Sequence, residues 1–187
     1  MLARVLVLLG VGLLTYVGWH YAEEAITQRQ LTTELRLAQQ RAPRAVSGTD
    51  AVRPPSSPFP WLVLIPRLGM SVAVVDGADD DRLRVAAGRI PGTGLPGRPG
   101  TIGIAAHRDT FFRRLRDIRI RDRVLLETAG RDFTYRVVST TIVEPEDTWV
   151  LQPGREQVLV LVTCYPFVFV GHAPQRFVVR AVREGGE

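Results

Sequence analysis

The sequence predicts one all-β domain, folded as a sandwich or a closed barrel, behind an N-terminal membrane anchor. Three observations support this prediction. Seven short runs rich in β-branched residues follow residue 60, and glycines and prolines separate them. The 17 glycines and 13 prolines exceed what a helical bundle tolerates. The first 19 residues contain a single charged side chain, that of Arg4.

Residues 1–22 are the predicted transmembrane anchor. Val5 to Trp19 has no charged side chain, and together with Met1 to Ala3 it just spans a hydrocarbon core, which needs about 20 residues. A cleaved signal peptide is the alternative, but the small-x-small site that cleavage requires is missing near Trp19. We therefore favour an uncleaved, single-pass anchor with its N-terminus in the cytoplasm and the remaining chain exported.

Residues 23–60 are expected to form a stalk helix and a linker. Ile26, Leu31 and Leu35 recur at helical spacing, and Pro43 ends the helix. The stretch from Ala42 to Pro60 contains five prolines among small and polar residues, a composition typical of a spacer. This segment would hold the following domain away from the membrane.

The β domain is expected over residues 61–187, a common size for one hydrophobic core. Its expected strands are Trp61–Pro66, Ser71–Gly77, Thr101–His107, Asp122–Thr128, Phe133–Val143, Gln157–Cys164 and Arg176–Val182. The fourth and fifth strands form a hairpin around the turn Ala129–Asp132. Two short helices are expected over Asp79–Ala87 and Asp109–Leu115.

The composition excludes several kinds of site. A single cysteine allows no intramolecular disulfide and no multi-cysteine metal site. All 24 basic residues are arginine, which excludes a Schiff-base or P-loop lysine. The glycine-rich loop over residues 88–100 lacks the dinucleotide-binding spacing, and the arginine run over residues 113–123 interleaves acids and apolar residues as a solvated face does. No cofactor, metal or nucleic-acid partner is expected, while the net charge of +5 suits a membrane surface.

The lone cysteine, Cys164, is the candidate nucleophile. It ends an apolar strand, and Pro166 stops that strand two residues later, so the thiol is expected at the edge between strand and loop. An isolated cysteine is most often a buried structural residue. In an exported chain, however, cysteines normally pair, so an unpaired thiol indicates reactivity.

A cysteine nucleophile needs an acid or base partner, and the sequence offers three histidines. His20 lies at the expected membrane edge. His107 ends an expected strand after Ala105 and Ala106, which leave room for a substrate backbone, whereas His172 lies in a loop nearer the cysteine. The end of a strand holds a ring more firmly than a Gly-His-Ala turn, so we prefer His107.

Arg176 is the candidate oxyanion donor. It begins the last expected strand, twelve residues after Cys164, and antiparallel pairing of the two strands would bring both residues to one end of the sheet. In the two-residue period of a strand, Arg176 shares one face with Val178 and Arg180, and the residues between them supply the core.

Three segments, IPRLGMSVAVVDG, GIAAHRDTFFRRL and LVTCYPFVFVGHAPQRFVV, together resemble the sortases, the membrane-anchored cysteine transpeptidases of bacterial surfaces. The sequence of the last segment is most similar to that of class D sortases. The resemblance covers the domain from Trp61 onward together with the anchor and linker. One position differs, because Val160 stands where the family's T-L-x-T-C signature has its first threonine.

The resemblance implies a closed eight-stranded β-barrel that binds an LPxTG-like sorting peptide. Cys164 would attack the carbonyl after the motif's threonine and form a thioacyl enzyme. His107 would protonate the departing amine, and Arg176 would hold the substrate and its oxyanion. An amine from a cell-wall precursor or a pilin would then resolve the intermediate, so the implied partners are surface proteins and such an acceptor. The expected peptide contacts are Ala105, Ala106, Val162, Thr163 and Tyr165.

Two alternatives stay open from the sequence. The domain could be a cysteine peptidase that releases its peptide to water. It could also be a non-catalytic, membrane-tethered β domain that binds peptide or wall polymer, with Cys164 as a structural residue.

Overall fold

The computed structural model describes residues 59–169 and 171–185. It also describes six single helical residues nearer the N-terminus, which are Arg4, Gly10, Val11, Leu14, Thr15 and Thr33. Most of the expected anchor over residues 1–22 and nearly all of the stalk and linker over 23–60 therefore lie outside the described residues. Among the residues that are described, no helix has the length and apolar character that a membrane crossing requires.

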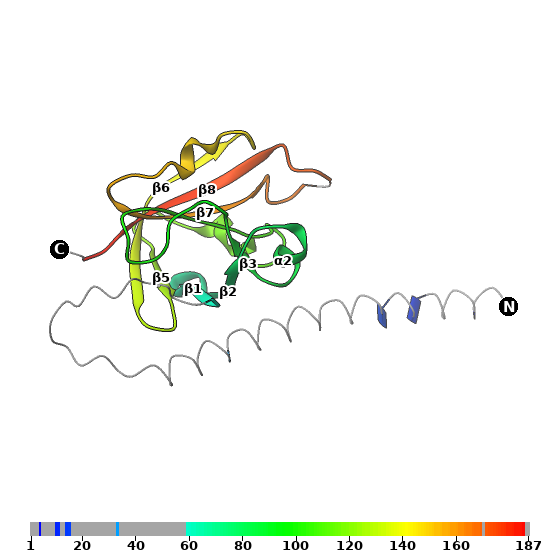
Figure 1. Cartoon of the computed structure of the whole chain (residues 1–187). Coiled ribbons are helices and arrows are strands. Elements are labelled where there is room, and N and C mark those ends of the chain that lie inside the picture. Colours follow the sequence, from blue (N-terminus) through cyan, green and yellow to red (C-terminus); the bar gives the residue numbers. More distant parts are fainter. Residues whose placement is uncertain are drawn as a thin grey trace.

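The strands of the described domain close into a barrel of eight (Figure 1). They are β1 (Trp61–Ile65), β2 (Met70–Asp76), β3 (Ala87–Arg89), β4 (Gly100–Ala105), β5 (Arg123–Glu127), β6 (Asp132–Val143), β7 (Gln157–Tyr165) and β8 (Gln175–Arg183). Around the barrel the order is β1-β2-β3-β4-β7-β8-β6-β5. Of the two predicted architectures, the closed barrel is correct. The predicted hairpin of β5 and β6 is also confirmed, with Glu127 paired to Asp132.

The barrel closes around one apolar interior because alternate residues of each strand point inward. Trp61, Val63 and Ile65 of β1 are fully buried there, as are Leu159 and Leu161 of β7. Seven of the eight strands were predicted from short runs rich in β-branched residues, and each of those seven is present.

The eighth strand, β3, was not predicted from the sequence. We expected a helix over Asp79–Ala87, but the helix α2 (Asp80–Val85) is shorter, with the Asp79 carboxylate capping it by accepting from the Arg82 backbone N–H. Beyond it the chain turns into β3, whose Gly88 approaches β2 so closely that a Cβ would lie 2.1 Å from the Gly77 carbonyl oxygen. A strand that needs small residues lacks the β-branched signal.

The second predicted helix, over Asp109–Leu115, is also wrong in position and type. A turn occupies its first residues, and a 3₁₀ helix, η2 (Arg113–Asp117), follows. Phe112 and Leu115 are both fully buried, and their spacing of three residues matches the period of a 3₁₀ helix. The segment between β4 and β5 thus inserts two side chains into the interior. A shorter 3₁₀ turn, η1 (Pro66–Leu68), links β1 and β2.

A second apolar cluster covers part of the outer face of the barrel. Its buried members are Val143, Val158, Val160 and Val178, from β6, β7 and β8. The unpredicted 3₁₀ helix η3 (Thr148–Leu151) contributes Val150 and Leu151 to it. Val178 lies on the face of β8 opposite to Val179 and Ala181, which belong to the interior as predicted, and η3 and the adjacent strands cover it.

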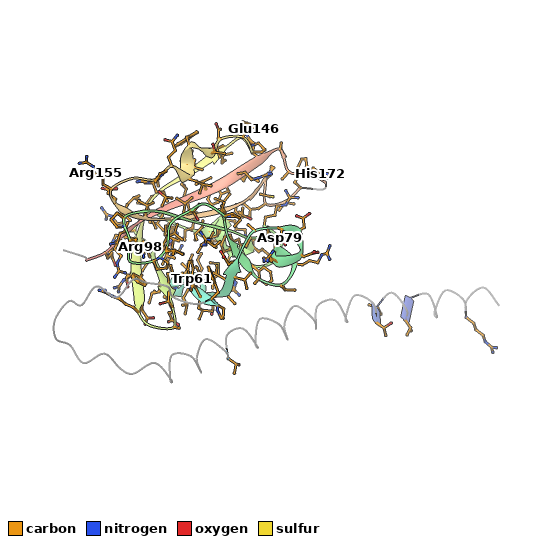
Figure 2. All side chains as sticks on the ribbon, in the orientation of Figure 1. Trp61, Asp79, Arg98, Glu146, Arg155 and His172 are labelled. Atoms are coloured by element: carbon orange, nitrogen blue, oxygen red, sulfur yellow. The ribbon has the colours of Figure 1, made fainter. Side chains whose placement is uncertain are left out.

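The strand directions bring the parts of the chain that carry the candidate site residues to one end of the barrel. β4 and β7 run parallel, and β8 runs antiparallel to β7, so the ends of β4 and β7 lie beside the start of β8. Figure 2 shows Arg98 and Arg155, which precede β4 and β7, at the left of the barrel, and His172, which follows β7, at the right.

Candidate active site

The thiol of Cys164 lies on the outer face of the barrel. Cys164 is the penultimate residue of β7 and is partly exposed and free. By strand alternation it shares its face with Val160 and Val162, both of which contact the outer apolar cluster, whereas Leu161 belongs to the interior. A partly exposed thiol just beyond a covered sheet surface is open to a substrate that lies along that surface.

Arg176 is the direct cross-strand neighbour of Cys164. The two residues are paired in the antiparallel ladder of β7 and β8, as the sequence predicted. Arg176 Nη1 donates to the carbonyl oxygens of Ala173 at 3.2 Å and Gln175 at 3.1 Å. Because both bonds use Nη1, the guanidinium is held at the start of β8 while its Nε and Nη2 groups can donate to a substrate oxygen.

His107 follows the parallel neighbour of β7. The register pairs Ala105 with Val162, and beyond the last pair the Ala106 N–H donates to the Val162 carbonyl at 3.2 Å. His107 is two positions beyond Ala105, and Cys164 is two positions beyond Val162. The backbone of the histidine therefore lies near the end of β7 that carries the thiol. The strand itself ends at Ala105, two residues before the predicted end. His107 is partly exposed, and its carbonyl accepts from the Phe112 N–H at 3.0 Å, which fixes the backbone of the histidine.

The five expected peptide contacts fall into two groups. Ala105 and Val162 are partly exposed and lie on the same outer face as the thiol. Ala106 and Thr163 point inward, where the buried Thr163 hydroxyl donates to the Ala106 carbonyl at 2.7 Å and ties β4 to β7. Tyr165 stacks with Phe177 and meets the ring of Phe167 edge-on, which closes this end of the interior.

Val160, the departure from the family signature, lies within the outer apolar cluster. It is 1% exposed, beside Val158 and Val178. A threonine hydroxyl at this position would need a hydrogen-bond partner there, because a buried polar group without one is costly. Valine suits the valine-rich cluster of this chain.

His172, the alternative acid, is exposed in the loop between β7 and β8, and Figure 2 shows it at the outer end of that loop. The parallel register of β4 and β7 brings the backbone of His107 alongside the end of β7, while His172 lies beyond it. In the described part of the chain, no three His, Cys, Asp or Glu side chains are grouped so that they could hold a metal ion.

Arg108 is a residue of this region that the sequence reasoning did not single out. Its guanidinium donates to three carbonyl oxygens of the loop that joins β7 and β8, those of Pro166, Phe169 and Gly171. The only sequence signal was an arginine directly after the candidate histidine. Every residue has a backbone carbonyl, so the sequence does not indicate which carbonyls accept from Arg108.

An ion pair at the same end of the barrel holds η1 against the segment before β5. Arg67 donates from Nε and Nη2 to the two carboxylate oxygens of the buried Asp122, at 2.5 and 2.6 Å. Asp122 also accepts from the Arg119 N–H at 2.8 Å. The hydrogen bond from Arg67, followed by that from the Arg119 N–H, lowers the pKa of Asp122 despite its burial.

Comparisons with known proteins agree on one family. The family model described as Sortase domain matches residues 63–184. Sortase D of Bacillus subtilis (strain 168) is 31% identical over 186 residues, which cover 93% of each chain.

Solved structures show the same fold. A Clostridium perfringens sortase D5 transpeptidase superposes with a TM-score of 0.67 at 22% identity, covering 88% of this chain and 99% of its own. A lid mutant of sortase A from Corynebacterium diphtheriae superposes with a TM-score of 0.64 at 23% identity, covering 87% of this chain and 96% of its own.

Proposed function

The chain belongs to the sortase family, and from that premise we propose that it is a class D-like cysteine transpeptidase that cleaves an LPxTG-like sorting signal after its threonine. The acyl part of the signal is carried on Cys164 as a thioacyl group and then passes to an amine. The similarity to sortase D over nearly the whole chain supports the class. The pairing of Cys164 with Arg176 is the observation that carries the chemistry.

In the first step the Cys164 sulfur forms a bond to the threonine carbonyl carbon, and the bond to the following amide nitrogen breaks. His107, as the imidazolium, gives a proton to that nitrogen, so the leaving group departs as a neutral amine. Cys164 is partly exposed on a face that an extended peptide can reach, which supports this role. The fixed backbone of His107 supports its role as the acid.

Arg176 stabilises the negative charge that develops on the carbonyl oxygen during this attack. Its cross-strand pairing with Cys164 and the two carbonyl bonds at Nη1, which hold the guanidinium at the start of β8, support this role. A donor that is already oriented before the reaction costs little reorganisation when the charge appears. Nε and Nη2 are the groups that would donate to the oxyanion.

In the second step an incoming amine attacks the thioacyl carbon. His107, now neutral, accepts the proton of the amine, the carbon–sulfur bond breaks, and Cys164 is restored as the thiolate. The amine belongs to a cell-wall precursor or a pilin, and the substrates are surface proteins that carry the sorting signal. The apolar segment over residues 1–22 supports attachment to the cell membrane with the barrel outside the cytoplasm.

The peptide lies along the outer ends of β4 and β7. Ala105 is small enough to let a peptide backbone approach the sheet, and Val162 adds an apolar contact on the same face. Ala106 and Thr163 serve this surface indirectly, because their hydrogen bond joins the two strands below it. Tyr165 contributes through the aromatic cluster that ends the interior.

The test incubates the full chain with a library of LPxTG-like peptides and a glycine peptide as the amine. We expect cleavage after threonine, a ligated product, and an acyl adduct on Cys164 that mass spectrometry detects. Cys164→Ala is the matched control and should give neither adduct nor product. Release of free acid at every amine concentration would identify a cysteine peptidase, and binding without consumption would identify a non-catalytic peptide-binding domain.

A further inference from the structure

The loop that joins β7 and β8, residues 166–174, spans the candidate site between the nucleophile and Arg176. It is described except at residue 170. Its central residues add little to the interior, because Val168 is 88% exposed and Phe169 is 45% exposed. Phe167, at the start of the loop, packs against the interior and against Phe177, whereas the residues beyond it have few apolar contacts and depend on polar interactions for their position.

Arg108 supplies those polar interactions from a different part of the chain. Its Nη1 donates to the Pro166 carbonyl at 3.0 Å, and its Nη2 donates to the carbonyls of Phe169 at 2.8 Å and Gly171 at 3.3 Å. The guanidinium carbon also lies 5.8 Å from the centre of the Phe169 ring, over its face. One side chain thus holds the loop at three residues.

The loop is held at both of its ends by guanidinium groups. Arg108 bonds to carbonyls from residue 166 to residue 171, and Arg176 bonds to the carbonyls of Ala173 and Gln175. Arg108 is the direct neighbour of His107, which lies on the segment after β4. The contacts of Arg108 therefore connect the segment that carries the histidine with the loop that follows the cysteine.

Only arginine fits this arrangement. The guanidinium presents five N–H donors in a rigid plane, so it reaches acceptors spread over several residues at once. A lysine ammonium donates from a single point and reaches fewer of these carbonyls. The charge also strengthens each bond relative to a neutral donor.

We propose that Arg108 is a positioning residue that fastens the β7–β8 loop to the His107 segment and thereby keeps the site ready to bind the peptide. This proposal rests on the proposed transpeptidase function. Without the guanidinium the loop opens, and only the closed fraction of the molecules binds the peptide well. The apparent affinity for the peptide is the affinity of the closed form multiplied by that fraction, whereas a saturating peptide closes the loop again. Removal of the guanidinium should therefore raise KM and leave kcat nearly unchanged.

The experiment compares Arg108→Ala and Arg108→Lys with the wild-type full chain. Arg113→Ala is the matched control, since Arg113 is an exposed arginine of η2 in the same segment. The first readout is chymotrypsin cleavage after Phe169, mapped by mass spectrometry, because the Phe169 carbonyl is one of those that Arg108 holds. The second is the KM and kcat of peptide transfer to a glycine peptide.

We expect Arg108→Ala to be cleaved after Phe169 several-fold faster than the wild type, with KM raised about tenfold and kcat within about twofold. Arg108→Lys should lie between the two, and Arg113→Ala should match the wild type. Unchanged cleavage in Arg108→Ala, an equal effect of Arg113→Ala, or a loss confined to kcat would each overturn the proposal. A wild-type chain without turnover would instead overturn the proposed function, and the cleavage rates would still decide whether Arg108 fastens the loop.

Discussion

Cys164 and Arg176 face each other across the antiparallel ladder of β7 and β8, although they lie twelve positions apart in the chain. This register sets the backbone of the only cysteine of the chain opposite that of an arginine whose guanidinium donates to two backbone carbonyls. Substitutions at these residues and at the histidines give separate tests of nucleophile, oxyanion donor and acid.

The first prediction concerns the accessibility of Cys164. A small methanethiosulfonate reagent should modify the thiol in the folded chain and stop turnover, because the residue is partly exposed on the outer face. Cys164→Ala should fold with an unchanged Tm and have no activity. Mass spectrometry measures the labelling, and a thiol that reacts only after denaturation would contradict a catalytic role.

The second prediction compares two arginines on the same face of β8. Arg176→Lys should lose at least tenfold in kcat/KM, about 1.4 kcal/mol, because lysine lacks the planar fork that reaches both carbonyls and the oxyanion. Arg180→Lys is the matched control, since Arg180 pairs with Glu156 at 3.5 Å and both side chains are largely solvated. Equal losses in the two variants would show that the site needs only a basic face.

The third prediction separates the two histidines. His107→Ala should lower kcat by about 10²-fold or more, as the loss of a general acid does, because its backbone is held beside the end of β7. His172→Ala should stay within several-fold of the wild type, since His172 is exposed in the loop. Steady-state kinetics on one peptide measure both, and the reverse ranking would assign the acid to His172.

The fourth prediction concerns stability and pH. Asp122 binds Arg67 through both carboxylate oxygens, and this bond lowers the pKa of Asp122 in the folded state. The carboxylate therefore stabilises the fold at pH values above its unfolded pKa of about 3.9, and this contribution is lost as the pH falls through the lower folded pKa. Asp122→Asn should lower the Tm at pH 7, and the difference from wild type should shrink on acidification. A difference that is constant from pH 7 to pH 2 would contradict the charge pairing.

Much of the barrel was predictable because seven strands are short runs rich in β-branched residues, separated by glycines and prolines. β3 was hidden because its Gly88 is needed for close approach to the Gly77 carbonyl, and such a strand has no β-branched pattern. The outer cluster around Val178 was missed because η3 covers it from a segment without a clear period. In each case long-range contacts decide the local structure.

The candidate site was predictable only in part, for a similar reason. Cys164 and Arg176 lie on consecutive strands, so antiparallel pairing alone indicated that they meet. The approach of His107 depends on the parallel pairing of β4 with β7, and the sequence does not show which distant strands pair. The choice of His107 rested on its expected place at the end of a strand and on the family resemblance, while the carbonyl partners of Arg108 could come only from the structure.

Because β4 pairs with the distant strand β7, the candidate site forms only when folding is nearly complete. Ala105 and Val162 are brought together only after the chain has closed a loop of more than fifty residues, which is entropically costly and slow. Arg176 belongs to β8, which closes the ladder between β6 and β7 last in chain order. A nascent chain that ends before β8 would already expose its thiol, yet it would lack the oxyanion donor. Under the proposed mechanism, acyl transfer thus begins only in a chain whose synthesis has passed the last strand.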